Sequence, residues 1–289
     1  MAYHVPALLE ESIRGLNIQP SGIYVDVTFG GGGHSGKILK HLTTGRLIAF
    51  DQDEDAERNV FSDDRFTFLN QNFRFLKNNL KFIGIDSVDG IIADLGVSFH
   101  QFDEPSRGFT FRHDAPLDMR MNKNGRQNAA DILASLNETE LADVFYEFGE
   151  LTNSRKIAKA IVAARMNKPL STVNDIDKAI GKLAPFRQKH KFYAKVFQAL
   201  RIAVNREMEF LKEMLEQALE VLNPRGRLVV ISYHSLEDRF YRQVAVQAYT
   251  ASNPFINLRE NPRMQLPNQV TIILVPEGGC TTDWEEPSE

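Results

Sequence analysis

Four consecutive glycines join a predicted strand to a predicted helix, and this junction constrains the fold more than any other part of the sequence. Residues 23–29, Ile-Tyr-Val-Asp-Val-Thr-Phe, are rich in β-branched and aromatic side chains, as expected of a buried strand. The glycines occupy residues 30–33, and residues 37–42 have a helical pattern. Such a loop lets the backbone approach a ligand closely, at the place where α/β sheets bind cofactors. The sequence therefore predicts an α/β fold with a ligand-binding loop, and a glycine-rich connector without a ligand is the alternative.

Two cofactors fit this loop. Asp26 ends the strand before the glycines, and a carboxylate suits the cationic sulfonium and amino groups of S-adenosylmethionine. However, residues 31–36 also match G-x-G-x-x-G, and Asp51 follows about 20 residues later, as in folds that bind nicotinamide dinucleotides. The loop alone leaves both interpretations open.

Composition narrows the class of protein. The 289 residues, 43% of them hydrophobic, can bury one large core or two smaller ones. The single cysteine, Cys280, excludes an internal disulfide framework and fits a reducing compartment. The start of the chain does not resemble a signal peptide, and no segment approaches the roughly 20 apolar residues that span a bilayer. We expect a cytoplasmic protein without membrane segments, and we predict no metal site.

Further strands are predicted in the βαβ rhythm of a parallel sheet, and a helical region interrupts them. The region from about residue 105 to 205 contains an Arg- and Asp-rich loop followed by helical patterns. The predicted strands after the first are 46–51, 66–70, 88–95, 226–232 and 269–275, and the predicted helices of the interruption are 141–148, 155–166 and 191–212.

Acidic residues stand at the ends of three predicted strands. Ligands of doubly wound sheets bind beyond the carboxyl ends of the strands, so Asp26, Asp51 and Asp94 should meet at one crevice. Asp51 is suited to accept hydrogen bonds from ribose hydroxyls, and Asp94 to face the adenine or the methionine end of a cofactor. One such acid is often a turn residue, but three at successive strand ends favour a site. Phe73 could flank adenine or belong to the core.

Charge is distributed unevenly. The whole chain has a net charge of −4, whereas residues 155–206 contain 13 Lys or Arg and only two acidic residues, a net charge of +11. This block predicts either a phosphate-binding surface or a solvated helix face. Four aromatic residues lie within it and could be core or base-stacking residues; we expect most to be core, because helical aromatics usually pack: Phe186, Phe192, Tyr193 and Phe197.

Seven segments resemble, in the same order, those of one family. They are Tyr3-His-Val-Pro-Ala-Leu-Leu9, Asp26-Val-Thr-Phe-Gly-Gly-Gly-Gly-His-Ser35, Asp94-Leu-Gly-Val-Ser98, Arg107-Gly-Phe-Thr-Phe111, Pro116-Leu-Asp-Met-Arg-Met121, Phe197-Gln-Ala-Leu-Arg-Ile202 and Ser232-Tyr-His-Ser-Leu-Glu-Asp-Arg239. The chain is similar on these grounds to the RsmH (MraW) family, bacterial S-adenosylmethionine-dependent methyltransferases that modify N4 of a cytidine in 16S ribosomal RNA, position 1402 by convention.

The resemblance implies a Rossmann-like class I S-adenosylmethionine-dependent methyltransferase sheet interrupted by a helical insertion. It implies that the methyltransferase domain comprises residues 1–104 and 206–289 and that a basic insertion comprises residues 105–205. The implied partner is 16S rRNA in the small ribosomal subunit, and no membrane association is expected. The protein could be a monomer or a homodimer. Phe99 and His100 depart from the family pattern, and so does the tail after Tyr249. The implied S-adenosylmethionine contacts are Gly32, Gly33, His34, Asp51, Phe73, Asp94 and Gln101.

Methylation of a cytosine amine sets a particular chemical demand. Its lone pair is delocalised into the ring, so a site must orient this pair and accept an N–H hydrogen bond as the amine becomes positive. The candidate acceptors are the backbone of residues 94–98 and the side chains of Asp94, Asp118, Ser232 and His234, although His234 could be structural.

Six cations are candidate RNA contacts. Arg107, Arg112 and Arg120 could hold phosphates, or pair with Asp114 or Asp118. Lys189, Lys191 and Lys195 belong to the cationic block. Two alternatives to the methyltransferase remain at this point: a nicotinamide oxidoreductase, and a noncatalytic ribosome assembly factor with a vestigial pocket.

Overall fold

The computed structural model describes residues 6–233, 263–265 and 271–276, and the chain divides into two compact units. Unit 1 contains residues 1–51, 55–96 and 211–289, and unit 2 contains residues 52–54 and 97–210. The predicted insertion, 105–205, falls within unit 2. His234 and most of the tail after Tyr249 lie outside the described residues.

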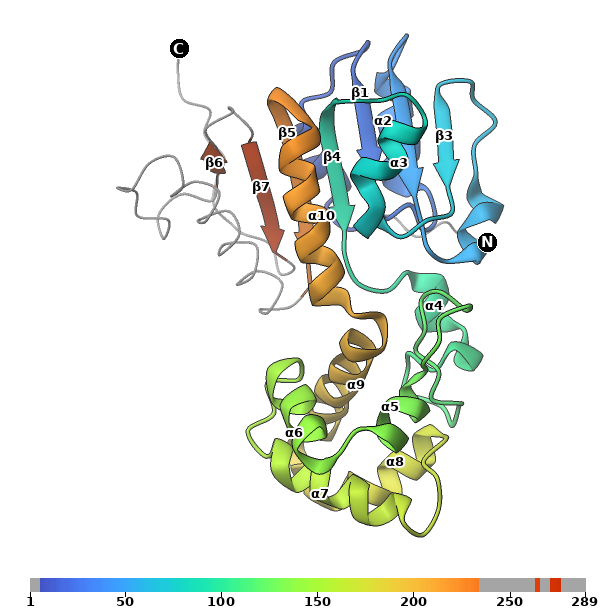
Figure 1. Ribbon diagram of the computed structural model, residues 1–289, viewed down its shortest axis with the longest axis vertical. Helices are drawn as coiled ribbons and strands as arrows, with labels where there is room; N and C mark the ends of the chain where they lie inside the picture. Colours follow the sequence, from blue (N-terminus) through green and yellow to red (C-terminus); the bar gives the residue numbers. More distant parts are fainter. Residues whose placement is uncertain (1–5, 234–262, 266–270, 277–289) are drawn as a thin grey trace. The chain divides into compact units, whose positions relative to one another are not determined.

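Unit 1 is built on a seven-stranded sheet with the order β3-β2-β1-β4-β5-β7-β6 (Figure 1). Neighbouring strands are parallel except for β6, which pairs with β7 antiparallel. The predicted α/β class is therefore confirmed. The strands are β1 (Ile23–Asp26), β2 (Arg46–Phe50), β3 (Phe66–Leu69), β4 (Val88–Asp94), β5 (Leu222–Ser232), β6 (Arg263–Gln265) and β7 (Thr271–Pro276).

The strand order reverses direction between β1 and β4. β2 and β3 extend the sheet on one side of β1, while β4 and β5 extend it on the other. Asp26 of β1 pairs in register with Ala49 of β2 and Ile92 of β4, so the carboxyl ends of these strands share one edge. In doubly wound sheets, ligands bind at this switch point.

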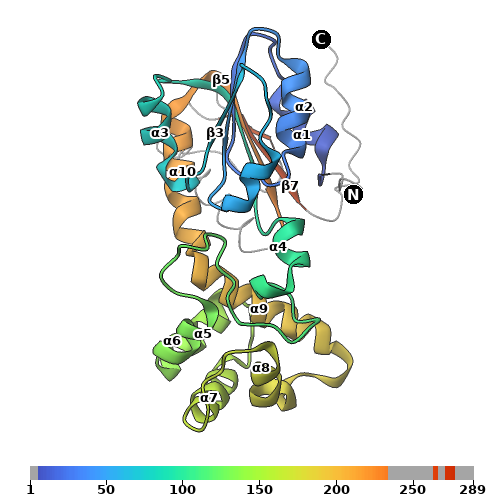
Figure 2. The ribbon, with the colours of Figure 1, turned by 90° about the vertical axis from the view of Figure 1, so that its right-hand side faces the viewer.

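Helices cover both faces of the sheet, as Figure 2 shows with the sheet nearly edge-on. α1 and α2 lie on one face, and α3 and α10 on the other. The Arg74 guanidinium, just before α3, donates two hydrogen bonds of 2.8 Å to the Glu213 carboxylate of α10. The helices are α1 (Leu9–Leu16), α2 (Gly33–His41), α3 (Leu76–Phe82) and α10 (Glu207–Val221), with the 3₁₀ helices η1 (Glu54–Asn59) and η2 (Phe73–Phe75).

Unit 2 is a helical domain with its own apolar core. Met119, Phe145, Ile157 and Val196 are fully buried in this core. Its α-helices are α4 (Phe99–Asp103), α5 (Ala129–Ser135), α6 (Glu138–Glu147), α7 (Ser154–Arg165), α8 (Val173–Ile180) and α9 (Lys189–Asn205), and its 3₁₀ helices are η3 (Pro105–Arg107), η4 (Gly181–Leu183) and η5 (Phe186–Gln188).

The aromatic residues of the cationic block divide as expected, with one exception. Phe192, Tyr193 and Phe197 are buried in the core of unit 2. Phe186, by contrast, is 98% exposed.

The predicted helix 191–212 is wrong in one respect, because the chain breaks at Arg206 into α9 and α10. Arg206 has a φ of 50°, in the left-handed region. The side chain of Asn205 accepts a hydrogen bond from the Met121 N–H and donates one to the Met119 carbonyl, both 2.7 Å long. These long-range hydrogen bonds fix the end of α9. The local sequence contains no Gly or Pro that would predict a helix end there. Among all described helices, none is both long enough and apolar enough to span a bilayer.

Candidate active site

The glycine loop packs tightly on one side and borders open space on the other. Gly32 has a φ of +76°, and a Cβ there would lie 3.0 Å from the Phe61 ring. A Cβ at Gly33 would lie 2.1 Å from Cγ of Pro6, so glycine is required for this close approach. A Cβ at Gly31 would meet no atom within 4 Å. The loop can therefore receive a ligand at Gly31, while Gly32 and Gly33 hold its shape.

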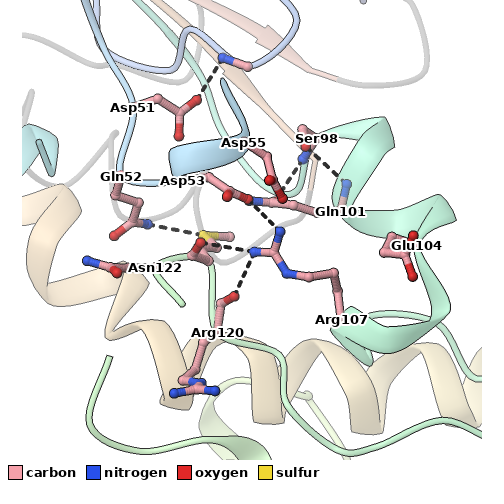
Figure 3. Close-up of polar contacts among 12 residues, drawn as sticks. Asp51, Gln52, Asp53, Asp55, Ser98, Gln101, Glu104, Arg107, Arg120 and Asn122 are labelled. Carbon is pink, nitrogen blue, oxygen red and sulfur yellow. Dashed lines mark hydrogen bonds and ion pairs between the residues drawn. The ribbon is translucent and has the colours of Figure 1, made fainter. Parts of the chain in front are cut away.

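Asp51 positions this loop from the end of β2. Its Oδ2 atom accepts a 2.7 Å hydrogen bond from the Gly30 N–H, and Figure 3 shows the carboxylate beside the loop backbone. The residue is partly buried. The hydrogen bond from Gly30 therefore orients the Asp51 carboxylate at the sheet edge where the strand order reverses.

Asp94 ends β4 beside the same loop. Its carboxylate accepts a 2.7 Å hydrogen bond from the Tyr233 hydroxyl and is 23% exposed. Nδ1 of the buried His34 lies 3.7 Å from Oδ2 of Asp94, and Nε2 lies 3.2 Å from the Ala7 carbonyl oxygen. Our reading of the sequence missed Tyr233; its place between Ser232 and His234, both candidate residues, was the available signal.

Asp26 differs from the other two acids because the protein encloses it. It is only 2% exposed, and its oxygens accept hydrogen bonds of 2.7 Å from the Ser35 hydroxyl and 3.0 Å from the Thr28 N–H. Burial raises the pKa of Asp26, against the opposing effects of His34, Ser35 and Thr28. Asp26 thus braces the loop from inside.

Two further candidates lie in unit 1. Ser232 is buried at the end of β5, one residue beyond Ile231, which pairs in register with Asp94. Phe73 is partly buried in η2, after β3. Ser232 is the last residue of its strand and Phe73 follows β3, so both lie towards the sheet edge predicted for the ligand.

Gln101 belongs to a buried polar network in unit 2 (Figure 3). Its Nε2 donates a 2.7 Å hydrogen bond to Oδ2 of Asp53, while its Oε1 accepts one of 3.1 Å from the Ser98 N–H and caps α4. Oδ2 of Asp53 also accepts a 2.8 Å hydrogen bond from Nη1 of Arg107. The capping box and the acid occupy both ends of the Gln101 side chain, so its predicted cofactor contact stays a prediction.

Arg107 is buried and bonded within the chain, an environment that does not favour the phosphate contact we predicted. It is 6% exposed, and its Nη2 donates hydrogen bonds of 2.9 and 3.0 Å to the carbonyls of Arg120 and Met121. Asp53, its buried partner, was also missed in the sequence. The only sequence signal for Asp53 was its position after β2, where one residue separates it from Asp51.

Asp118 and Arg120 pair with each other, which was the alternative we had left open for Arg120. Nε and Nη2 of Arg120 donate to the two oxygens of Asp118 at 2.8 and 2.7 Å. Burial favours a higher pKa for Asp118, but the bonds from Arg120 outweigh it and hold the pKa below its ordinary value. Asp118 is therefore a weak base, and neither residue is a strong candidate for contact with RNA.

The remaining cations differ in their surroundings. Lys189 lies 3.2 Å from Asp177, and Lys195 donates a 3.3 Å hydrogen bond to the Glu150 carbonyl. Arg112 is exposed, with its guanidinium 5.4 Å from the Phe102 ring centre. Lys191 is exposed, and no acid among the described residues pairs with it.

The residues at the sheet edge of unit 1 fit S-adenosylmethionine. Gly31 offers an open approach to backbone, and the carboxylates of Asp51 and Asp94 can accept hydrogen bonds from hydroxyl and amino groups. Carboxylates also complement the positive charges of this cofactor. The arrangement can therefore bind a cationic nucleoside.

The family model described as the MraW methylase family matches residues 1–271 of the chain. Three relatives bear the name Ribosomal RNA small subunit methyltransferase H. The protein of Phocaeicola vulgatus is 57% identical over 243 residues, which are 84% of this chain and 80% of that protein. The protein of Bacteroides fragilis is 52% identical over 275 residues (93% and 90%), and that of Flavobacterium johnsoniae is 52% identical over 244 residues (84% and 81%). The chain belongs to the MraW methylase family.

Proposed function

We propose that this chain transfers a methyl group from S-adenosylmethionine to N4 of one cytidine in 16S rRNA of the small ribosomal subunit. The observation that carries the proposal is family membership at more than 50% identity to proteins named as small-subunit rRNA methyltransferases. The nicotinamide oxidoreductase loses its support, because the matching family is one of methylases. A ribosomal substrate would place the protein in the cytoplasm.

Residues of unit 1 would hold the cofactor. Asp51 would accept hydrogen bonds from the ribose hydroxyls while it keeps the Gly30 N–H, and Asp94, oriented by Tyr233, would accept from an amino group. Gly32, Gly33 and His34 would shape the loop around it. Phe73 completes the predicted set from unit 1, and the contact predicted for Gln101 of unit 2 stays a prediction. The bound cofactor supplies an electrophilic methyl group.

The protein's contribution to the reaction is mainly positional. The cytosine amine must point its lone pair at the methyl carbon, and in-line positioning of this kind is worth about 7–11 kcal/mol in favourable cases. An acceptor must also hold the amine N–H as its charge develops. The Ser232 hydroxyl, the Asp94 carboxylate and the backbone of residues 94–98 are the candidates in the described chain, and His234 remains a prediction outside it. Asp118 is the weakest candidate, because Arg120 occupies both its oxygens.

Methyl transfer from labelled S-adenosylmethionine tests the proposal. The target amine lies on the Watson–Crick edge, so a paired cytidine would have to leave its stack at a cost of a few kcal/mol. We expect small-subunit particles to be much better substrates than a short duplex or free cytidine. Asp94→Ala should abolish transfer through cofactor binding, whereas Ser232→Ala or His234→Ala should lower turnover more than cofactor affinity if either residue serves the base.

Two outcomes would contradict the proposal. Label on C5 or on a ribose hydroxyl would show a different methyltransferase. Bound cofactor without transfer to any ribosomal particle would support the noncatalytic assembly factor.

A further inference from the structure

Phe186 is exposed to an extent that the core of unit 2 does not explain. It is 98% exposed, whereas the next three aromatic residues along the chain, Phe192, Tyr193 and Phe197, are buried. Single exposed apolar residues are common, so exposure alone indicates nothing. The surroundings of Phe186 distinguish it.

Phe186 stands in the middle of a segment without negative charge. No acidic residue occurs from Lys178 to Arg206. In the described chain, the acids that pair with cations of this segment are Asp177 with Lys189, Glu150 with Lys195, Glu207 with Arg201 and Glu209 with Arg206. Lys182, Arg187 and Lys191 are exposed, and no acid of the described chain pairs with any of them. Three exposed cations therefore lie close to Phe186 in the sequence, within the ten residues 182–191.

The backbone holds Phe186 in place. Pro185, whose φ is −63°, precedes it, and η5 runs directly into α9. The Gln188 N–H donates a 2.9 Å hydrogen bond to the Pro185 carbonyl. One turn later the Tyr193 hydroxyl donates to Asp177 of α8, which anchors the start of α9. Figure 2 shows this connection between α8 and the beginning of α9. A ring presented on an anchored turn loses little entropy on binding.

We infer that Phe186 is a base-stacking site for single-stranded RNA, with Lys182, Arg187 and Lys191 holding the adjacent phosphates. The aromatic face accepts any unpaired base, and the cations follow the backbone. This combination does not suit a duplex, whose bases are already stacked. The inference rests on the proposed function for its RNA substrate, and it adds an unpaired segment of that RNA, bound by stacking, to the contacts of the enzyme.

Direct binding of a labelled 12-nucleotide single-stranded RNA, measured by fluorescence anisotropy, tests the inference. Stacking on an aromatic side chain is worth about 1–3 kcal/mol per base, so Phe186→Leu should lower the affinity roughly 5- to 150-fold. Phe186→Trp should keep it. A hairpin duplex of similar length should bind Phe186→Leu and the wild type equally. Phe82→Leu is the matched control, because Phe82 is 89% exposed on α3 of unit 1.

The salt dependence separates stacking from phosphate contact. Phe186→Leu should leave the slope of log affinity against log salt unchanged, since it releases no counterion. The triple variant Lys182→Gln, Arg187→Gln, Lys191→Gln should flatten the slope by about 2, since each lost contact removes about 0.7 for single strands. Lys189→Gln and Lys195→Gln should flatten it less, because both lysines already have partners.

Several results would overturn the inference. Equal affinity of Phe186→Leu and wild type for the single strand, an equal loss for Phe82→Leu, or no measurable binding of the single strand by the wild type would each do so. A loss with duplex as large as with single strand would assign Phe186 to an RNA contact other than stacking on unpaired bases. These assays do not use methyl transfer, so a failed methylation test would leave their result intact and distinguishable.

Discussion

Three acids at three strand ends have different environments, and those environments separate their roles. Asp26 is enclosed and bonded to Ser35 and Thr28, Asp51 holds the glycine loop by one oxygen, and Asp94 is half-buried and bonded to Tyr233. Sequence alone treats the three alike. The first should therefore matter for the loop itself, and the other two for a ligand.

Substitution of Asp51 tests this separation. Asp51→Ala removes bonds from a charged acceptor, worth about 1.5–3 kcal/mol each, so S-adenosylmethionine affinity should fall at least tenfold in calorimetry. Asp26→Asn is the control: its amide keeps an acceptor for Thr28 and a hydrogen bond with Ser35, so cofactor affinity should persist. Both variants should remain folded by circular dichroism. Unchanged affinity in folded Asp51→Ala would assign Asp51 a purely structural role.

Arg107 should govern stability instead of RNA binding. Removal of one partner of a buried ion pair costs about 3–5 kcal/mol, because the other charge stays buried alone. Arg107→Met should therefore lower the free energy of unfolding by about this amount in urea denaturation, and adding Asp53→Asn should recover part of the loss. Arg112→Gln, at an exposed arginine, should change stability little. An Arg107→Met variant of full stability with weakened RNA binding would restore the phosphate role.

At the scale of elements, the helix ends of unit 2 are fixed by caps and ion pairs. Thr172 and Asp175 form a capping box at the start of α8. Oδ1 of Asp175 accepts a 2.9 Å hydrogen bond from Lys168, and Oδ2 accepts bonds of 3.2 Å from the N–H groups of Ser171 and Thr172. The bond from Lys168 is the main cause that lowers the pKa of Asp175 to about 2.

This pKa gives a pH-dependent prediction. A carboxyl group whose pKa is lower in the folded state stabilises the protein above its unfolded pKa, near 4, and loses that effect as the pH falls towards 2. Asp175→Ala should lower the free energy of unfolding by about 1–2 kcal/mol at pH 7, as for a lost cap. The difference from wild type, measured by urea denaturation, should shrink between pH 4 and pH 3. A difference independent of pH would show that the charge of Asp175 contributes nothing.

At the scale of the whole molecule, the sequence predicted the sheet better than the site. Buried β-branched strands and the glycine loop are local features, so the parallel strands and the ligand-binding loop could be located. The break at Arg206 depends on Asn205 bonding to residues more than 80 positions earlier, and no local pattern contains that information. The same holds for the pairing of Arg107 with Asp53, which are 54 positions apart. The pairing of Arg120 with Asp118 is local, and the sequence offered it as an alternative. Asp51 and Asp94 could be predicted because ligands bind at the carboxyl ends of parallel strands. Tyr233 bonds to Asp94, and Asp53 bonds to Gln101 and Arg107, and no sequence pattern predicts these contacts.

The central claim is methylation of one cytidine of small-subunit rRNA at N4, and nucleoside mass spectrometry tests it most directly. Ribosomal RNA would be compared from cells that contain the protein, cells that lack it, and cells that carry Asp94→Ala instead. We expect N4-methylated cytidine at one position of 16S rRNA with the wild type only. An unchanged level of this nucleoside without the protein, or a loss of methyl groups from C5 or ribose in its place, would contradict the account.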